Sequence, residues 1–297
     1  MTPRVTVGIA FRNPGRYFEP ALKSVLLQTF TDWELILVDD GSSDESLTLA
    51  RSLKDPRVRV YSDGLSKRLN ARLNELVTLA RAPYFFRMDA DDIMHPERLE
   101  RQLAELLRHG NDTVIGSSAY SIDSYSNIVG FRQCRNNLSG FAAHLSFIHP
   151  SVAAATEWFR RNPYSESFIF HRSQDAELWC RTAPHSKFIN LPEPLLYYRE
   201  AGVFSYENYL GSQLGLIFLL RTRFCQPRWR CFTGMAKGLG KVFSVSVFDA
   251  MGLGEMVVGR RFRRLTPEQR QRAEDGLTRI LSCPPQDSTI RRDGCYQ

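Results

Sequence analysis

The stretch YFFRMDADDIMHPERL, residues 84–99, joins an apolar run to three aspartates and then to the start of a helical pattern. The apolar run predicts a strand, and Pro96 is typical of a first helical position. The carboxylates of Asp89, Asp91 and Asp92 repel one another unless a cation, a proton or solvent relieves the repulsion. A solvated turn that caps the following helix would account for the cluster equally well.

Strands and helices alternate through the first half of the chain. Apolar and β-branched runs predict strands at residues 5–11, 33–38, 58–61 and 84–88. Helical spacing of apolar residues predicts helices at residues 20–29, 46–53, 65–81 and 96–108. Strands separated by helices form βαβ units, so we expect an α/β fold with a Rossmann-like, mostly parallel sheet that has helices on both faces.

The pattern is looser in the second half of the chain. Strands are expected at residues 112–119, 187–190 and 195–199, a hairpin arm at 121–131, and helices at 139–147 and 175–181. Strand signals fade after residue 205, and helices are expected at residues 209–220, 232–259 and 265–281. The last of these begins with a capping box from Thr266 to Gln269.

Two of the predicted strands end in carboxylates. Asp39 and Asp40 follow the second strand, and Asp89 and Asp91 follow the fourth. Open parallel sheets bind ligands at the carboxyl ends of their strands, so the two pairs are expected to share a site. Carboxylates there coordinate Mg²⁺ or Mn²⁺, which also accept phosphate oxygens as ligands. A glycine-rich phosphate loop is missing from the sequence, and an ion that holds a diphosphate does not need one.

Three segments of the chain resemble the family 2 glycosyltransferases, inverting enzymes of the GT-A fold that are common in bacterial cell-surface polysaccharide synthesis. They are SVLLQTFTDWELILVDDGSSDES (24–46), ARLNELVTLARAPYFFRMDADDIMHPERL (71–99) and SQDAELWCR (173–181). The resemblance implies a GT-A catalytic domain over residues 1–205, with a nucleotide-sugar half that ends near residue 110 and an acceptor half after it. A basic helical extension over residues 206–297 would follow.

The resemblance also implies roles for single residues. Asp39 would contact the nucleotide base and Asp40 would support it, while Arg68 is a further candidate for the nucleotide. Asp89 and Asp91 would form the family's Asp-x-Asp motif, in which Asp91 is the closer metal ligand.

Asp175 matches the position of the family's catalytic base, before a Leu-Trp helix. The elementary chemistry agrees, because an inverting transfer needs one carboxylate to take the proton of the acceptor hydroxyl. It also needs stabilisation of the departing nucleotide diphosphate, which a divalent metal supplies. The alternative role for Asp175 is to cap the N-terminus of the helix.

The chain departs from the family's pattern at two places. Residues 10–13 read Ala-Phe-Arg-Asn where the family has Pro-x-Tyr-Asn, and residues 198–201 read Tyr-Arg-Glu-Ala where it has Tyr-Arg-x-His. No histidine is available at the second place, although Arg199 could face a phosphate or lie on the surface. His149 and Trp179 are candidate acceptor contacts, with a structural histidine and core packing as the alternatives.

Positive charge is concentrated near the C-terminus. The whole chain carries a net charge of +7, and residues 221–264 hold ten Lys or Arg against two acids. Basic residues interleaved with aromatics are typical of an interfacial helix on anionic lipid. We therefore expect attachment to the inner membrane surface, with a solvated helical cap as the alternative. Without a recognised module, nucleic acid binding is not expected.

Location and redox state follow from simpler features. The N-terminus lacks the pattern of a secretory signal, and no apolar stretch reaches the length of a membrane span, so a cytoplasmic protein is expected. The six cysteines form neither a Cys-x-x-Cys pair nor a zinc-ligand spacing, and we expect reduced thiols.

The leading hypothesis is a metal-dependent, inverting hexosyl or glycosyl transferase that moves a sugar from a nucleotide diphosphate sugar, most readily a UDP-sugar, to a glycan or lipid-linked acceptor. Residues 226–229, Gln-Pro-Arg-Trp, fall one residue short of the Gln-x-x-Arg-Trp motif of processive synthases, so one sugar per encounter is expected. The alternatives are a sugar-phosphate nucleotidyltransferase and a non-catalytic subunit that binds nucleotide sugars or glycans.

Overall fold

The computed structural model describes residues 2–134, 147–200, 206–221, 236, 238–240, 242–246 and 263–282. The described strands are β1 (Val5–Phe11), β2 (Trp33–Asp39), β3 (Val58–Tyr61), β4 (Tyr84–Asp89), β5 (Ile93–Met94), β6 (Thr113–Ile122), β7 (Ile128–Arg132), β8 (Ala153–Ala155) and β9 (Lys187–Arg199). The described α-helices are α1 (Phe18–Leu26), α2 (Ser46–Ser52), α3 (Arg68–Leu79), α4 (Arg98–His109), α6 (Thr156–Arg161), α7 (Gln174–Thr182), α8 (Tyr206–Arg221) and α11 (Pro267–Leu281). Short 3₁₀ turns lie at η1 (Gly15–Tyr17), η2 (His149–Ser151), η3 (Phe168–Phe170) and η4 (Ala183–His185).

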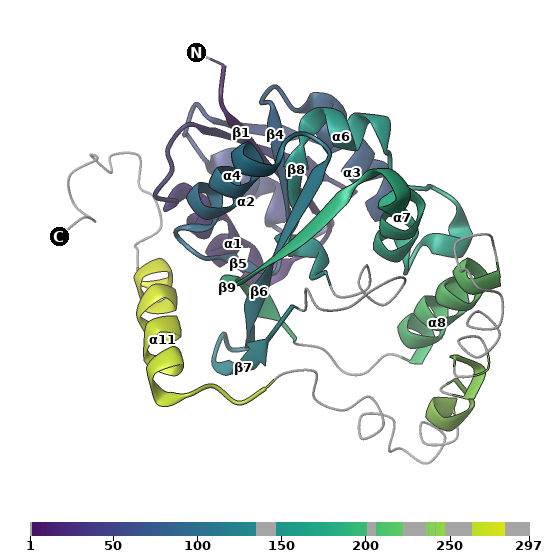
Figure 1. The fold of residues 1–297 in the computed structure, drawn as a ribbon. Helices are drawn as coiled ribbons and strands as arrows, with labels where there is room; N and C mark the ends of the chain where they lie inside the picture. Colours follow the sequence, from purple (N-terminus) through teal and green to yellow (C-terminus); the bar gives the residue numbers. More distant parts are fainter. Residues whose placement is uncertain are drawn as a thin grey trace.

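Within the described residues these strands form one sheet, in the order β3-β2-β1-β4-β8-β6-β9-β5, with β7 paired to β6 (Figure 1). The first four strands in that order include three parallel pairs, and β6 is parallel to β9. The short strand β8 is antiparallel to both β4 and β6, and β5 is antiparallel to β9. The expected α/β class with a mostly parallel sheet is confirmed.

Helices cover both faces of the sheet because the side chains of β4 alternate between two cores. Phe86 and Met88 pack with apolar residues of α1 and α4, while Phe85 packs with those of α3, α6 and α7. The four apolar residues of α1 that are fully or almost fully buried are Phe18, Ala21, Leu22 and Val25. These spacings place one stripe of the helix on the sheet.

Helix α11 covers the far end of the sheet. Ala273, Leu277 and Ile280 are buried against a cluster that includes Tyr197 of β9 and Ile93 of β5. The Tyr197 hydroxyl donates a hydrogen bond to the carbonyl oxygen of Ala273 at 3.1 Å. The capping box at its start is present as expected, with Thr266 accepting from the Gln269 backbone N–H. Figure 1 shows α11 (yellow) and α8 (green) on opposite sides of the sheet.

Several expected elements differ from those observed. The helix expected at 65–81 begins at Arg68, because the residues before it form a turn that a carboxylate holds in place. The two strands expected at 187–190 and 195–199 are one strand, β9. Strands β5 and β8 and helix α6 were not expected. The helix expected at 139–147 lies almost wholly outside the described residues, and only parts of the one expected at 232–259 are described.

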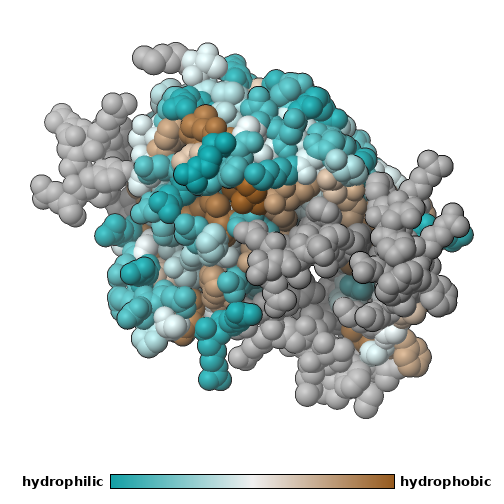
Figure 2. Space-filling view, viewed as in Figure 1, coloured by the Kyte–Doolittle hydropathy of each residue, from teal (hydrophilic) through white to brown (hydrophobic). Residues whose placement is uncertain are grey.

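On the face seen in Figure 2, hydrophilic residues cover most of the described part, and hydrophobic residues form patches between them. Among the described helices, none combines the length and the apolar character that crossing a bilayer requires.

Candidate functional site

The carboxyl ends of three neighbouring parallel strands meet at one edge of the sheet. In β1, Phe11 pairs with Asp39 of β2 and Ala10 pairs with Asp89 of β4. The register therefore places the two aspartates at the same edge, one strand apart. This edge is where an open α/β sheet binds its ligand.

Asp39 and Asp40 are both buried at the end of β2. Asp39 accepts hydrogen bonds from the Ser42 backbone N–H and the Ser62 hydroxyl, each at 2.9 Å. Asp40 accepts from the backbone N–H groups of Lys67 at 2.6 Å and Arg68 at 3.2 Å. Asp40 thus fixes the turn before α3.

Gly41 allows this turn to close. Its φ is +76°, and a Cβ at this position would lie 3.3 Å from the backbone of Leu65. A left-handed backbone and a close approach both favour glycine here. The loops after β2 and β3 therefore lie against each other.

Arg72 is a site residue that the sequence analysis missed. Its guanidinium is fully buried and pairs with Asp40 at 3.0 Å, Asp63 at 2.6 Å and Glu75 at 2.7 Å. Burial opposes its charge, but the three carboxylates outweigh burial and raise its pKa. An arginine within the apolar stripe of α3, next to Leu73, was the available signal.

Asp89, Asp91 and Asp92 form an acidic cluster directly after β4. Each offers one carboxylate oxygen, and these oxygens lie within 4.8 Å of one another. Asp92 is 1% exposed, and its Oδ1 accepts from the Arg199 backbone N–H at 2.8 Å. Its buried Oδ2 has no hydrogen-bond partner in the described part of the chain. An orphaned oxygen beside two further carboxylates fits a divalent cation such as Mg²⁺ or Mn²⁺.

Crowding also changes the protonation of this cluster. Although the Asp91 side chain is exposed, partial desolvation by the surrounding protein raises the pKa of its carboxyl to about 6, and the negative charge of Asp89 adds to the effect. Complete burial raises the pKa of Asp92 well above its ordinary value, with contributions from both neighbours. The ionised carboxylates of the cluster therefore repel one another, and a bound cation would reduce this repulsion.

Arg199, a predicted phosphate contact, is 6% exposed and lies beside this cluster. Its guanidinium donates to the carbonyl oxygens of Asp91 at 2.8 Å and Asp123 at 2.6 Å, and to the Ser126 hydroxyl at 3.0 Å. The ring of Tyr17 covers it, 4.3 Å away. In this structure Arg199 fastens the acidic turn to the turn between β6 and β7.

Arg87 is a second residue that the sequence analysis missed. Its side chain is 2% exposed, and its Nη2 donates to a carboxylate oxygen of Asp89. Its Nε and Nη1 are buried and have no partner among the described residues. An arginine two positions before Asp89 shares its face of the strand, which was the available signal.

Asp175 lies in the first turn of α7 and is partly buried. Burial raises the pKa of its carboxyl, while the backbone N–H of Ala176 and the charge of Arg87 oppose this and the charge of Asp89 reinforces it. These interactions bring the predicted base into the electrostatic range of the acidic cluster.

His149 and Trp179, the predicted acceptor contacts, lie in the second core. Trp179 is 1% exposed and stacks on Trp158, with ring centroids 6.2 Å apart. His149 is 9% exposed, and its Nε2 lies 2.9 Å from the Tyr164 hydroxyl. Burial and the positive charge of Arg87 lower the pKa of His149, so the ring is neutral. The structure therefore gives both side chains packing contacts rather than an open surface.

Arg68, the other predicted nucleotide contact, is exposed. It has a φ of +73°, and its guanidinium lies 5.0 Å from the centroid of the Phe168 ring. Asp40 holds its backbone N–H, which explains how a non-glycine residue keeps this conformation.

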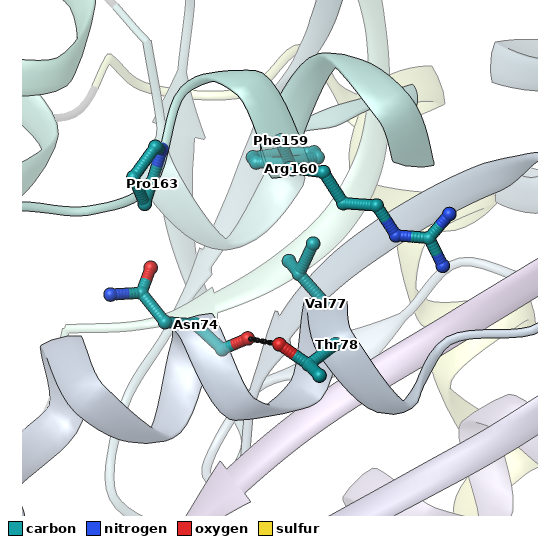
Figure 3. A pocket seen from close by; sticks show the side chains of 6 residues that line it. All are labelled: Asn74, Val77, Thr78, Phe159, Arg160 and Pro163. Atoms are coloured by element: carbon teal, nitrogen blue, oxygen red, sulfur yellow. Dashed lines mark hydrogen bonds between the residues drawn. The ribbon is translucent and has the colours of Figure 1, made fainter.

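A cavity of about 460 Å³ lies between α3 and α6 (Figure 3). Its lining residues are Asn74, Val77, Thr78, Phe159, Arg160 and Pro163. Arg160 donates to the carbonyl oxygen of Ala80, shortly before β4 begins. The cavity is thus on the side of the amino ends of the strands and holds no carboxylate, so it is not part of the acidic site.

The family model and the similar proteins all point to the same family. The family model described as glycosyl transferase family 2 matches residues 6–167. The putative glycosyltransferase EpsE of Bacillus subtilis is 30% identical over 208 residues, 67% of this chain and 73% of that protein. The O-antigen biosynthesis glycosyltransferase WbnJ of Escherichia coli is 27% identical over 219 residues, 66% of this chain and 79% of that protein.

Solved structures agree on the fold. Residues 1–349 of TarS from S. aureus, in complex with UDP, superimpose with a TM-score of 0.61 at 16% identity, covering 94% of this chain and 81% of that chain. This likeness confirms the expected GT-A fold class. Together with the matched family model, this shows that the chain belongs to glycosyl transferase family 2.

Proposed function

We propose that this glycosyltransferase moves a sugar from a UDP-sugar to a glycan or lipid-linked acceptor in the synthesis of a surface polysaccharide, with inversion and one sugar per encounter. The observation that carries the proposal is the meeting of Asp39 and the acidic cluster at the carboxyl edge of the sheet. The charges of Asp89 and Arg87, which act on the pKa of Asp175, support a place for Asp175 near the same site. TarS structures with bound UDP and UDP-GlcNAc support a uridine donor, and the name of WbnJ supports polysaccharide synthesis.

The donor would lie along the carboxyl edge. Asp39 would accept a hydrogen bond from the nucleotide base, and Asp40 with Arg72 would keep the loop around the base in shape. Arg68, which is exposed, and Arg199, which lies beside the acidic cluster, would supply positive charge for the diphosphate. The carboxylates of Asp89, Asp91 and Asp92 would hold Mn²⁺ or Mg²⁺, which when bound neutralises charge on the departing diphosphate.

Asp175 would act as the general base. Its raised pKa makes it a better proton acceptor than an ordinary aspartate, while the backbone N–H of Ala176 and the charge of Arg87 limit the rise. Its carboxylate would take the proton of the acceptor hydroxyl as that oxygen attacks the anomeric carbon. Only one protein carboxylate is needed, which favours inversion over a double displacement.

The test is a screen of nucleotide sugars with the wild type and with Asp175→Asn, in the presence of Mn²⁺. Loss of a general base is expected to lower the rate of UDP release about 10²- to 10⁴-fold, with UDP affinity unchanged. The rate is measured by UDP release and the affinity by calorimetry. An Asp175→Asn variant as fast as the wild type would contradict the assignment, and a wild type that binds UDP without turnover would support a binding subunit instead.

A further inference from the structure

Helix α8 lies against the segment that leads into the Asp175 helix, and it does so through glycines. Gly211 and Gly215 are four residues apart and therefore share one face of α8. A Cβ at Gly215 would lie 2.0 Å from Ser173 Oγ and 3.2 Å from the carbonyl oxygen of Ile169. A Cβ at Gly211 would lie 3.3 Å from Cγ of Arg172. A side chain at position 215 would therefore clash with the Ser173 hydroxyl and press on the Ile169 carbonyl oxygen.

Further contacts extend this interface along α8. The Ser212 hydroxyl donates to the carbonyl oxygen of Arg172 at 3.1 Å, and Phe218 meets Phe170 edge to face with centroids 5.7 Å apart. Ser173 is 3% exposed, and its hydroxyl oxygen is buried without a hydrogen-bond partner among the described residues. Packing against Gly215, rather than a hydrogen bond of its own, therefore fixes this side chain.

Ser173 is the residue directly before α7, and Asp175 is the second residue of that helix. The helix has nine residues, so its start is not held by a long run of its own hydrogen bonds. A shift of Ser173 would move the Asp175 carboxylate with it, because only two peptide bonds separate the two residues. The contact between α8 and Ser173 is thus a mechanical link to the predicted base.

We propose that α8, through Gly215 and Ser173, positions Asp175 for catalysis. The proposal rests on the proposed role of Asp175 as the base. It makes Gly215 and Ser173 positioning residues, and it makes the first helix after the sheet domain part of the catalytic apparatus.

The test adds a methyl group to the contact between Gly215 and Ser173 and then, in a second variant, removes the side chain that the methyl group would meet. Gly215→Ala puts a Cβ only 2.0 Å from Ser173 Oγ, and Ser173→Gly in the same chain removes both the hydroxyl and the Cβ that it would meet. Gly240→Ala is the matched control, since nothing lies within 4 Å of a Cβ at that helical position among the described residues. Alanine is the better helix former, so the helix itself is not weakened.

The readout is hydrolysis, in the presence of Mn²⁺, of the UDP-sugar that the wild type cleaves fastest. Gly215→Ala is expected to lower kcat about 10- to 100-fold, with the KM for the donor and the affinity for UDP unchanged. The double variant is expected to regain most of kcat, and Gly240→Ala to match the wild type. A folded Gly215→Ala with wild-type kcat, or a double variant as slow as the single one, would overturn the proposal.

A second measurement keeps the contact testable without activity. Hydrogen exchange of residues 169–176 is expected to become faster in Gly215→Ala and to return toward the wild-type rate in the double variant. Unchanged exchange in all variants would overturn the proposal. An inactive wild type, or a fully active Asp175→Asn, would instead contradict the proposed function, so the two failures are distinguishable.

Discussion

At the residue scale, three buried arginines balance three clustered aspartates. Arg87 pairs with Asp89, and Arg199 binds the backbone and carboxylate of the acidic turn. Arg98, completely buried, has a pKa lowered to about 9 by burial, and the charge of Asp92 opposes this effect. A divalent cation in the cluster would therefore leave a net positive site, which suits a diphosphate.

Because protons compete with a metal for the same oxygens, Mn²⁺ affinity is expected to depend on pH. The pKa of Asp91 is about 6 in the metal-free chain, so its carboxylate is free above pH 6 and protonated below it. Below pH 6 the Kd for Mn²⁺ should rise about tenfold per pH unit for one displaced proton. Calorimetry at pH 7.5, 6.5 and 5.5 measures this.

Asp91→Asn serves as the control for that titration. This variant should bind Mn²⁺ weakly at every pH, because it lacks one anionic ligand. Equal Mn²⁺ affinity of the wild type at pH 7.5 and pH 5.5 would speak against a metal site at these carboxylates.

The residues that the sequence predicted lie at the ends of helices and strands, whereas those that it missed lie inside them. The strand pattern alone predicts Asp39 and Asp89 at the carboxyl edge, where the register places them. The role of Asp175 came from the family resemblance and stays a proposal. Arg72 and Arg87 were missed because a charged residue within a helix or strand looks solvated until its carboxylate partners are known. The burial of Trp179 depends on contacts between segments that are far apart in the chain, and the sequence alone does not reveal these contacts.

At the scale of elements, prediction succeeded where apolar residues follow a regular spacing. Strand β3 and helix α7 lie within a residue of their expected bounds. Strand β8 is only Ala-Ala-Ala, and its strand conformation comes from antiparallel pairing with β4 and β6 rather than from β-propensity. The six-residue α6 is too short to show a helical repeat.

Helix α11 offers a direct test of its attachment to the sheet. Ile280 is fully buried, whereas its neighbour Leu281 is 41% exposed. Ile280→Ala is expected to lower the free energy of unfolding by about 2 to 4 kcal/mol, because it leaves a cavity beside Tyr197. Leu281→Ala should cost less than about 1 kcal/mol. Urea denaturation followed by circular dichroism compares the two, and equal losses would show that α11 does not pack as described.

At the scale of the whole molecule, the described parts of the C-terminal region contact the sheet domain at two separate places. Helix α8 packs on the segment before α7, and α11 packs on β5, β7 and β9. A domain boundary at residue 205 therefore remains a proposal. Removing residues 206–297 would expose the apolar cluster around Tyr197 to solvent. Membrane attachment is better tested in the full chain by changing charge alone.

Full-length protein is expected to bind anionic phosphatidylglycerol vesicles more strongly than neutral phosphatidylcholine vesicles. Each basic residue near an anionic surface contributes about 1 kcal/mol, so four substitutions should reduce binding by up to about 10³-fold. The test variant carries glutamine at Arg228, Arg230, Arg260 and Arg261. Co-sedimentation at low and high salt measures the binding.

The matched control has the same charge change on the exposed surface of the sheet domain. It carries glutamine at Arg51, Arg81, Arg101 and Arg108. Equal pelleting of the two variants would show that net charge, and not the C-terminal region, governs the attraction to lipid.

The loop that Asp40 and Arg72 hold has a consequence for how a nucleotide would arrive. Four hydrogen bonds from Lys67, Arg68 and Arg72 already fix the turn before any donor binds. The base would then enter a preformed cradle, and association would lose little chain entropy to loop ordering. Selectivity for the nucleotide would therefore come from the fixed shape of this loop, and not from closure of the loop around the bound base.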